Sequence, residues 1–175
     1  MALYEFSGRR PRIHPEAFVH EMAVLIGDVE IGAGCYIGPC ASLRGDFGRI
    51  EVGEGCNVQD GCVLHVAPKE VCRLLPNSHI GHAAVVHGAQ IGRDVMIGMN
   101  AVIMDGAEIG EASIVAASAF VSTAQRIPPG VLVMGVPGRV VRALTPEEIA
   151  AKRHGTTLYQ ALARESLATM KRIDV

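Results

Sequence analysis

The segment IGRDVMIGMNAVIMDGAEIGEASIVAASAFVSTAQRIPPGVLV, residues 91–133, carries an aliphatic side chain at every sixth position. With one repeat before it, the series is Val85, Ile91, Ile97, Ile103, Ile109, Val115, Val121, Ile127 and Val133. A period of six fits neither the 3.6-residue period of an amphipathic helix nor the two-residue alternation of a simple strand. It is typical of a hexapeptide solenoid, in which short strands stack coil upon coil and each aliphatic side chain points into a continuous core.

The same period extends toward the N-terminus, with two interruptions. It runs through Ile13, Val19, Leu25, Ile31, Ile37 and Leu43 and resumes one phase over at Val52, Val58 and Leu64. The first interruption, residues 44–49, adds three residues to the series. The second, residues 66–79, contains Pro68, Pro76 and Asn77 and is interpreted as a loop that leaves the solenoid. Because three repeats usually form one coil, we expect roughly six or seven coils between residues 13 and 136.

Beyond the solenoid, the sequence predicts a helical C-terminal segment. Thr145 is placed as the N-cap, Pro146 as the first helical residue and Glu148 as the partner in a capping box. We expect Gly155 to divide this segment, and residues 157–173 to form an amphipathic helix that lies against the solenoid or a neighbour. The predicted organisation is thus an all-β solenoid domain over residues 1–140, with the inserted loop 66–79, and a helical segment over 141–175.

Composition excludes several classes of function. The net charge of −2 gives no footprint for nucleic acid or for an anionic membrane. The N-terminus lacks the basic and apolar pattern of a signal peptide, and no run of about twenty apolar residues could span a membrane. Five cysteines, with no Cys-x-x-Cys pair, predict small and mostly buried thiols in a reducing cytoplasm. They are Cys35, Cys40, Cys56, Cys62 and Cys72.

Three histidines, His65, His82 and His87, flank the second interruption. Three neutral imidazoles with an open fourth position would form a catalytic metal site of the zinc hydrolase type. Zinc suits this donor set best, and iron(II) or cobalt(II) also fits it. Taken alone, the three residues fit equally well as surface or hydrogen-bonded histidines, so the metal site is one of two interpretations.

Two polar motifs stand out in a chain this apolar, Gln59-Asp60 and Arg44-x-Asp46. An amide, two carboxylates and a guanidinium are suited to orienting imidazoles and a nucleophilic water. Arg44 with Asp46 or Asp60 could equally form an ion pair that holds two subunits together. Unrelated surface residues are the third interpretation.

With the spacing of each motif kept, these residues resemble the γ-class carbonic anhydrase family. The stretches LRGDFGRI (43–50), MNAVIMDG (99–106) and GTxxYQ (155–160) are similar to the subgroup that contains the phenylacetate-degradation protein PaaY and the carnitine-operon protein CaiE. The resemblance covers nearly the whole chain. It implies a left-handed parallel β-helix, against the general right-handed rule for crossovers, and this handedness rests on the resemblance alone.

The resemblance also implies a homotrimer with one metal at each subunit interface. His65 and His87 would come from one chain and His82 from its neighbour. Arg44 and Asp46 would then serve the interface. Gln59 and Asp60 would lie near the metal and its water, and Tyr159 completes the catalytic group that we assign.

The chain departs from the best-studied carbonic anhydrases of this family at two places. Phe47 stands where those enzymes carry an active-site Glu, and Glu70 is the only acid in the loop over residues 66–73. Fast CO2 hydration must export a proton in each turnover, so a missing shuttle argues against an efficient anhydrase. Lys69 and Arg73 give the loop a net positive charge, which would suit an anionic CoA thioester, although an ordinary solvated loop explains them too.

The sequence therefore predicts a metal-dependent thioesterase of the PaaY type, acting on CoA thioesters in phenylacetate or aromatic-acid catabolism. The alternative is a γ-class carbonic anhydrase, which hydrates CO2 reversibly. A hexapeptide acyltransferase is less favoured: such enzymes often end the solenoid with Gly-x-Pro, as at 135–137, but usually rely on one histidine and no metal. A non-enzymatic trimeric scaffold is the remaining alternative.

Overall fold

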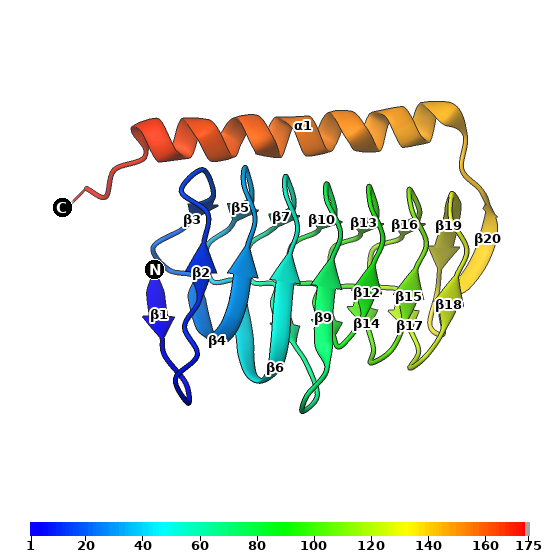
Figure 1. Ribbon diagram of the computed structural model, residues 1–175. Helices are drawn as coiled ribbons and strands as arrows, with labels where there is room; N and C mark the ends of the chain where they lie inside the picture. Colours follow the sequence, from blue (N-terminus) through cyan, green and yellow to red (C-terminus); the bar gives the residue numbers. More distant parts are fainter. Residues whose placement is uncertain (174–175) are drawn as a thin grey trace.

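The computed structural model describes residues 1–173 and shows a β-solenoid of about seven turns with one C-terminal helix (Figure 1). Short strands of successive coils pair in parallel, and the hydrogen bonds run from each coil to the next. The predicted all-β solenoid with a helical C-terminal segment is confirmed. Each coil contributes strands to three faces, which are described in turn because the candidate site lies at their edges.

The first face comprises β1 (Ala2–Tyr4), the first halves of β4 (Val24–Ile31) and β6 (Ser42–Val52), β8 (Val63–His65), β11 (Val85–His87), β14 (Val102–Ile103) and β17 (Phe120–Val121). The second comprises β2 (Arg12–Ile13), the second halves of β4 and β6, β9 (Val71–Leu74), β12 (Gln90–Ile91), β15 (Glu108–Ile109) and β18 (Arg126–Ile127). Strands β4 and β6 bend around the edge between these two faces, so the two faces form one twelve-stranded sheet.

The third face is a separate eight-stranded sheet. Its strands are β3 (Phe18–Val19), β5 (Tyr36–Ile37), β7 (Asn57–Val58), β10 (His79–Ile80), β13 (Met96–Ile97), β16 (Ile114–Val115), β19 (Val131–Met134) and β20 (Arg139–Ala143). Every pairing in it is parallel except that of β20, which folds back antiparallel to β19 at the end of the solenoid.

The core is the stack of inward aliphatic side chains that the period of six predicts, fully buried from Leu25 onward with one exception. Val85 faces outward in register with Val63, and its neighbour Val86 is the buried residue. Ile91 follows Val86 by five positions instead of six, so the coil at this corner is one residue shorter than the period predicts. Glycine permits close approach where coils stack: a Cβ at Gly98 would lie 2.4 Å from the backbone nitrogen of Ala117.

The two interruptions of the repeat are more regular than the sequence suggests. Residues 44–49 lie within the continuous strand β6, whose register against β4 shifts between Gly27 and Val29. The interpretation of residues 66–79 as one loop is wrong, because β9 occupies residues 71–74 and pairs with β6 and β12. Cys72 and Leu74 fill inward positions of β9 at a two-residue spacing, which a search for sixes does not detect.

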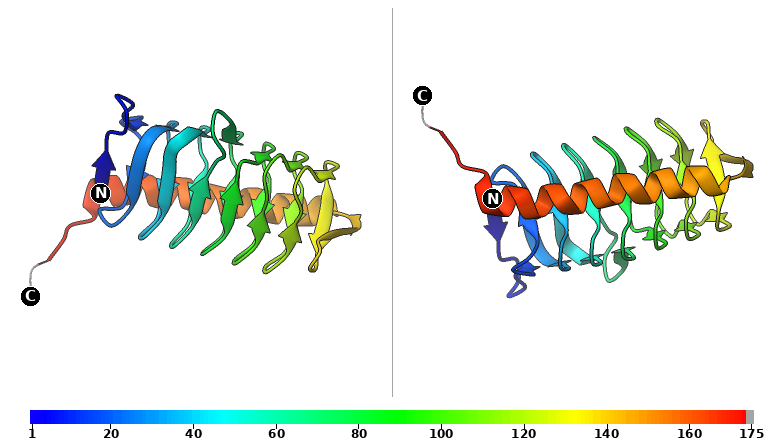
Figure 2. Two further views of the ribbon diagram at one scale, coloured as in Figure 1. Left: turned by 90° about the horizontal axis from the view of Figure 1, so that it is seen from below. Right: turned by 90° about the horizontal axis from the view of Figure 1, so that it is seen from above.

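The helix α1 (Pro146–Thr169) runs back along the solenoid toward its N-terminal end (Figure 2). The predicted capping box is confirmed: the Thr145 hydroxyl accepts from Glu148 N at 3.2 Å, and the Glu148 carboxylate accepts from Thr145 N at 2.9 Å. The prediction that Gly155 divides the segment is wrong, since the helix continues through it. Packing at both sides of one glycine outweighs its cost of about 1 kcal/mol.

The buried side of α1 is polar, contrary to the expected apolar face. Its buried residues are Lys152, Thr156, Ala163 and Ser166, whereas Leu158 is 57% exposed. The helix lies over corner turns whose carbonyl groups need donors, so Lys152 Nζ donates to Asn77 O and Gln160 Nε2 donates to Gly55 O. Desolvation lowers the pKa of Lys152 to about 8, although Asp94 partly opposes the shift.

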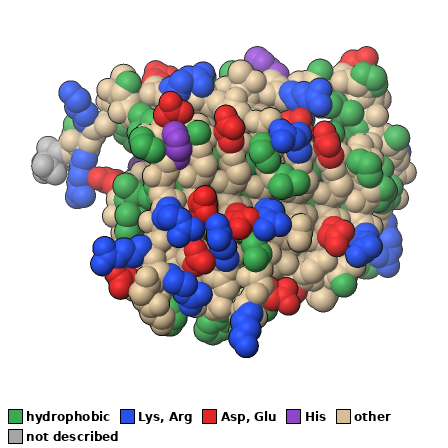
Figure 3. Space-filling model, viewed as in Figure 1, with side chains coloured by type: hydrophobic (Ala, Val, Ile, Leu, Met, Phe, Trp, Pro, Cys, Tyr) green, Lys and Arg blue, Asp and Glu red, His purple; other side chains and the backbone are tan. Residues whose placement is uncertain are grey.

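The second face carries charged side chains in alternation, and Figure 3 shows Lys or Arg beside Asp or Glu across this side of the molecule. Arg12 pairs with Glu30 at 3.0 Å, and Arg49 pairs with Glu51 at 2.9 Å. The solenoid therefore has one face that meets water through its own ion pairs. No helix within residues 1–173 is long and apolar enough to cross a membrane.

Four cysteines, Cys35, Cys56, Cys62 and Cys72, are buried thiols and Cys40 is exposed, so the expectation of mostly buried thiols is confirmed. Burial raises the pKa of Cys62 to about 11 and that of Cys56 to about 12. Cys56 Sγ donates to Leu75 O at 3.2 Å. These thiols therefore stay protonated and serve the packing of corner turns.

Candidate functional site

His65 and His87 form a pair at the edge where the first face turns into the second. They end β8 and β11, which are neighbouring parallel strands, and the register places one directly beside the other. Their ring centroids lie 5.0 Å apart, and His65 Nδ1 is 3.0 Å from His87 Nε2. The edge-on rings thus bring two imidazole nitrogens to one point.

The other nitrogen of each ring meets a carboxylate. Asp46 Oδ1 lies 3.1 Å from His65 Nε2, and Asp105 Oδ1 lies 2.6 Å from His87 Nδ1. The tautomers in which each carboxylate accepts its ring's proton leave a lone pair on each of the two facing nitrogens, and that arrangement favours a cation between them. Two nitrogens bound to one tetrahedral zinc would lie about 3.3 Å apart, close to the spacing of this pair. The donor set therefore fits a divalent metal.

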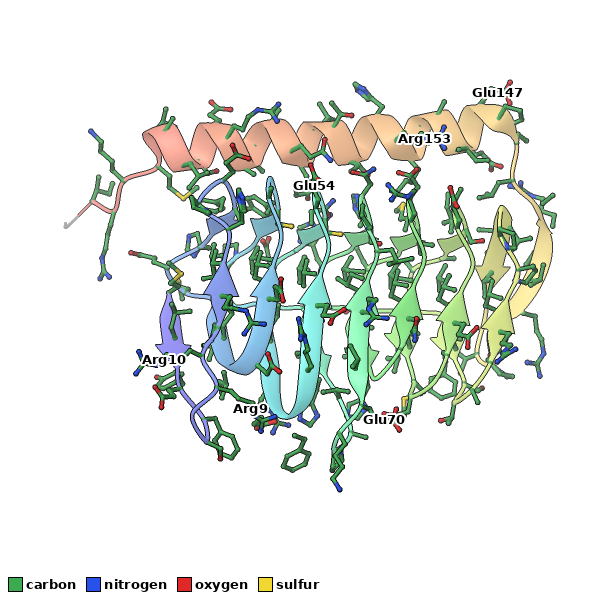
Figure 4. The ribbon with its side chains drawn as sticks, in the orientation of Figure 1. Arg9, Arg10, Glu54, Glu70, Glu147 and Arg153 are labelled. Carbon is green, nitrogen blue, oxygen red and sulfur yellow. The ribbon has the colours of Figure 1, made fainter. Side chains whose placement is uncertain are left out.

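Asp46 is held as a carboxylate by several donors. Arg44 donates to its Oδ2 at 2.9 Å and Phe47 N to its Oδ1 at 2.9 Å. Burial opposes ionisation, but the hydrogen bonds from Arg44, His65 and Phe47 N outweigh it and lower the pKa of Asp46. Arg9 also donates to the Asp46 carbonyl at 2.8 Å, and Figure 4 shows Arg9 near the bend of β6. Arg44 and Asp46 thus form an ion pair within one chain.

His82 lies at a different edge, between the third face and the first. Its Nδ1 is 3.2 Å from Asp60 Oδ2, and both side chains are about half exposed. Strand β11 separates His82 from His87, so a single chain does not join the three predicted ligands. Within residues 1–173 no group of three His, Cys, Asp or Glu side chains is arranged to hold a metal.

Gln59 and Tyr159 lie in a cluster between the third face and α1. Gln59 is buried, with its Nε2 2.6 Å from His79 Nε2 and 3.0 Å from Asn57 Oδ1. The Tyr159 ring meets His79 edge-on, with centroids 5.3 Å apart. Desolvation raises the pKa of Tyr159, and desolvation, with a smaller contribution from Lys152, lowers that of His79 to about 4. His79 is therefore neutral near pH 7.

The cluster leaves buried donors without partners: Asn57 Nδ2 and His79 Nδ1 are among the side-chain atoms in the described part of the chain that make no hydrogen bond. Within one chain, then, Gln59 and Tyr159 do not touch the His65–His87 pair. Gln59 lies near His82 instead, because the next residue, Asp60, contacts that histidine.

The region around Phe47 differs from the expected cationic loop. Arg73 pairs with Glu51 on the second face at 2.5 Å, so its positive charge is offset within the chain, and binding of an anionic substrate there stays a prediction. Phe47 is 54% exposed, and its ring lies 5.5 Å from that of His65. Glu70 lies at the lower edge in Figure 4, and Lys69 N donates to the Phe47 carbonyl at 3.2 Å.

Sequence reasoning missed Asp105 and His79. The register of β11 against β14 pairs residues 17 apart, so Asp105 lies one position beyond the partner of His87, and stacking could have placed it near the histidine. It also falls inside the stretch 99–106 that carries the resemblance. His79 gives no such signal, because only its coverage by α1 reveals the cluster.

Comparison with known proteins identifies relatives that share the repeat and most of the chain. The repeat described as "Bacterial transferase hexapeptide (six repeats)" matches residues 10–45 and 88–123. The carnitine operon protein CaiE of Escherichia coli K12 is 54% identical over 162 residues, which cover 93% of this chain and 83% of CaiE. CaiE of Salmonella agona is 52% identical over 163 residues, covering 93% of this chain and 82% of that protein.

Two solved structures share the whole fold. A Bacillus cereus protein provisionally named an acetyltransferase superposes with a TM-score of 0.94 and 33% identity, covering 95% of this chain and 97% of that one. A hexapeptide transferase family protein of Anaplasma phagocytophilum gives a TM-score of 0.90 and 34% identity, with 93% and 96% covered. With half of its residues shared over nearly its full length, this chain belongs to the CaiE family of hexapeptide-repeat proteins.

Proposed function

We propose that this protein is a homotrimeric, metal-dependent thioesterase that hydrolyses an aromatic acyl-CoA thioester. The observation that carries the proposal is the His65–His87 pair, in which each ring lies against its own carboxylate and the two facing nitrogens are 3.0 Å apart. A hydrogen-bonded surface histidine needs no such arrangement.

The residues that would hold the metal are His65 and His87 of one subunit and His82 of the next. When bound, a divalent metal such as zinc, iron(II) or cobalt(II) supplies Lewis acidity, which polarises a carbonyl group and activates water near neutral pH. Asp46 orients His65 through Nε2, and Asp60 orients His82 through Nδ1. Gln59, next to Asp60, is available to orient the water or the substrate.

The outward surface of the first face supports the trimer. Its outward column is apolar on strands β8, β11 and β14, and Val63 there is 40% exposed in one chain. His82 lies at one edge of this face and the His65–His87 pair at the other. A head-to-tail contact between these two edges would close a threefold ring and would complete one site at each interface.

Phe47 favours a thioester with an aromatic acyl group over CO2. The exposed ring beside His65 provides an apolar wall where an anhydrase would need an acid to export protons. Aromatic rings stack or meet edge-on with a gain of roughly 0.5–1.5 kcal/mol beyond burial. We therefore expect CO2 hydration to be slow and to increase when buffer such as imidazole carries the proton.

An acyltransferase is the second candidate, favoured by the names of the two solved relatives. Both reactions break an acyl-CoA thioester, and they differ in whether water or another acceptor takes the acyl group. A transferase that needs no metal would retain its rate after chelation, whereas the proposed hydrolase would lose it.

The test compares three reactions on one preparation of metal-replete protein: hydrolysis of phenylacetyl-CoA, CO2 hydration, and acetyl transfer to amine and hydroxyl acceptors. We expect thioester hydrolysis that chelation abolishes and added metal restores. The control is His154→Ala, which removes an exposed helix histidine and should hydrolyse normally. Fast, buffer-independent CO2 hydration or chelator-resistant transfer would contradict the proposal.

A further inference from the structure

Asp105 is the other carboxylate of the histidine pair and lies one coil beyond His87. Its Oδ1 lies 2.6 Å from His87 Nδ1, closer than Asp46 lies to His65. The Asp105 side chain is 35% exposed and that of His87 is 30% exposed, so the contact is partly shielded from solvent. Within residues 1–173, Asp105 makes no ion pair with Lys or Arg, which distinguishes it from Asp46 with its partner Arg44.

The backbone of the preceding coil makes room for this carboxylate. Gly88 directly follows His87, and a Cβ on Gly88 would lie 2.6 Å from Asp105 Oδ1. A side chain at residue 88 would therefore push the carboxylate away from the imidazole. Gly88 has a φ of +57°, but other corners of the solenoid hold alanine at the same angle, such as Ala83 and Ala124. The left-handed conformation alone thus does not require glycine here.

We infer that Asp105 is a positioning residue that fixes the proton of His87 on Nδ1 and so leaves Nε2 free to bind the metal. Gly88 is the position that lets it do so. A neutral imidazole binds metal through the nitrogen without the proton, and a carboxylate on the opposite nitrogen selects that tautomer and fixes the ring. This inference rests on the proposed function, since it assigns Asp105 to the same metal site.

The first experiment measures metal affinity, with cobalt(II) as the probe. Metal-free protein is titrated with cobalt(II), and binding is followed by its visible absorption. Loss of a carboxylate behind a ligand histidine typically weakens metal affinity by about 10–100-fold. We expect this loss for Asp105→Ala, a smaller one for Asp105→Asn, whose amide oxygen still accepts from Nδ1, and none for Asp28→Ala. Asp28 is the matched control, because it lies at the same edge, near Arg12, and contacts no histidine within residues 1–173.

Gly88→Ala supplies an independent route to the same contact. The substitution should weaken cobalt(II) binding in the wild-type background and have little further effect in the Asp105→Ala background, because both changes remove one interaction. Additive losses in the double variant would show that Gly88→Ala acts through the backbone instead.

A second measurement does not depend on the metal. In metal-free protein, imidazole nitrogen NMR should show the His87 proton on Nδ1, and Asp105→Ala should shift it toward a mixture of tautomers. Cobalt(II) binding by Asp105→Ala as tight as that of wild type, or a His87 proton on Nε2, would overturn the inference. Wild-type protein that binds no cobalt(II), with the Nδ1 proton still dependent on Asp105, would instead contradict the proposed function.

Discussion

The first and second faces of the solenoid share the same kind of inward residue and differ in what points outward. The outward column of the first face reads Val24, Ser42, Val63, Val85, Val102 and Phe120. The corresponding column of the second face reads Arg12, Glu30, Glu51, Arg73, Gln90, Glu108 and Arg126. Inward aliphatic residues build the coil, and outward residues decide what each face meets.

The second face is complete in one chain, because its charges pair across neighbouring coils and meet water. Nothing within residues 1–173 covers the first face in this way, and the two halves of the predicted ligand set lie at its opposite edges. The third face is intermediate between the two, because the helix α1 of the same chain covers part of it. Coverage by a second subunit is therefore what the first face is suited to.

The largest expected effect follows from placing a charge on the first face. Val85→Glu should prevent trimer formation, because an unpaired buried charge costs several kcal/mol and the ring contains three copies. Gln90→Glu, which adds the same charge to the neighbouring second face, should leave assembly intact. Light scattering measures both. A Val85→Glu protein that remains a trimer would show that the first face is not the interface.

Alanine substitutions at inward positions of the two faces should lower the free energy of unfolding by similar amounts. Leu64→Ala on the first face and Leu74→Ala on the second each remove a fully buried side chain. Each should lower the free energy of unfolding by about 2–5 kcal/mol. Urea unfolding at one protein concentration compares them, since assembly adds to apparent stability. A difference larger than that range would mean that the core also distinguishes the faces.

Burial of His79 at the third face should make the stability of the protein depend on pH. The folded-state pKa of His79, about 4, lies below the ordinary value of about 6.5, so its contribution to stability is present above pH 6.5 and is lost as the pH falls toward 4. The loss amounts to at most about 3 kcal/mol. His79→Gln should flatten the stability profile in this window, whereas His154→Gln should not. Identical slopes for wild type and His79→Gln would contradict the burial of a neutral His79.

The smallest effect is expected on the second face itself. Glu51→Gln removes one of the two partners of Arg49 and the partner of Arg73, and both arginine side chains are more than a third exposed. Exposed ion pairs contribute about 0–1 kcal/mol, and salt screens them. The urea midpoint should therefore fall slightly at low salt and hardly at all at high salt. A large loss that persists in high salt would mean that these charges do more than satisfy one another in water.

Much of the fold could be predicted from the sequence, because each coil repeats one local rule. The period of six located the inward residues of most coils, and Thr145 located the start of the helix. The rule failed where the coil changes length, as at Val85, and where inward residues alternate in twos, as in β9. An apolar period also failed to predict the buried side of α1, because this helix packs on corner carbonyl groups that accept hydrogen bonds from polar side chains such as Lys152.

The candidate site could be predicted only in part. His65 and His87 lie side by side, as the family resemblance implies, although the interruption between them hides their register from the period of six. His82 and Tyr159 depend on contacts between edges or with the helix, which a period along the chain does not encode. Asp105 was within reach, because it follows the strand that stacks on β11 and contacts His87.

We propose that each site is divided between two subunits, and mixing of subunits provides a decisive test. His65→Ala and His82→Ala proteins should each be inactive and deficient in metal. After the two are unfolded, mixed in equal amounts and refolded, random assembly restores all three ligands at about a quarter of the interfaces. We expect activity and tightly bound metal near that fraction of wild type. A mixture that stays inactive, although light scattering shows trimers, would contradict it.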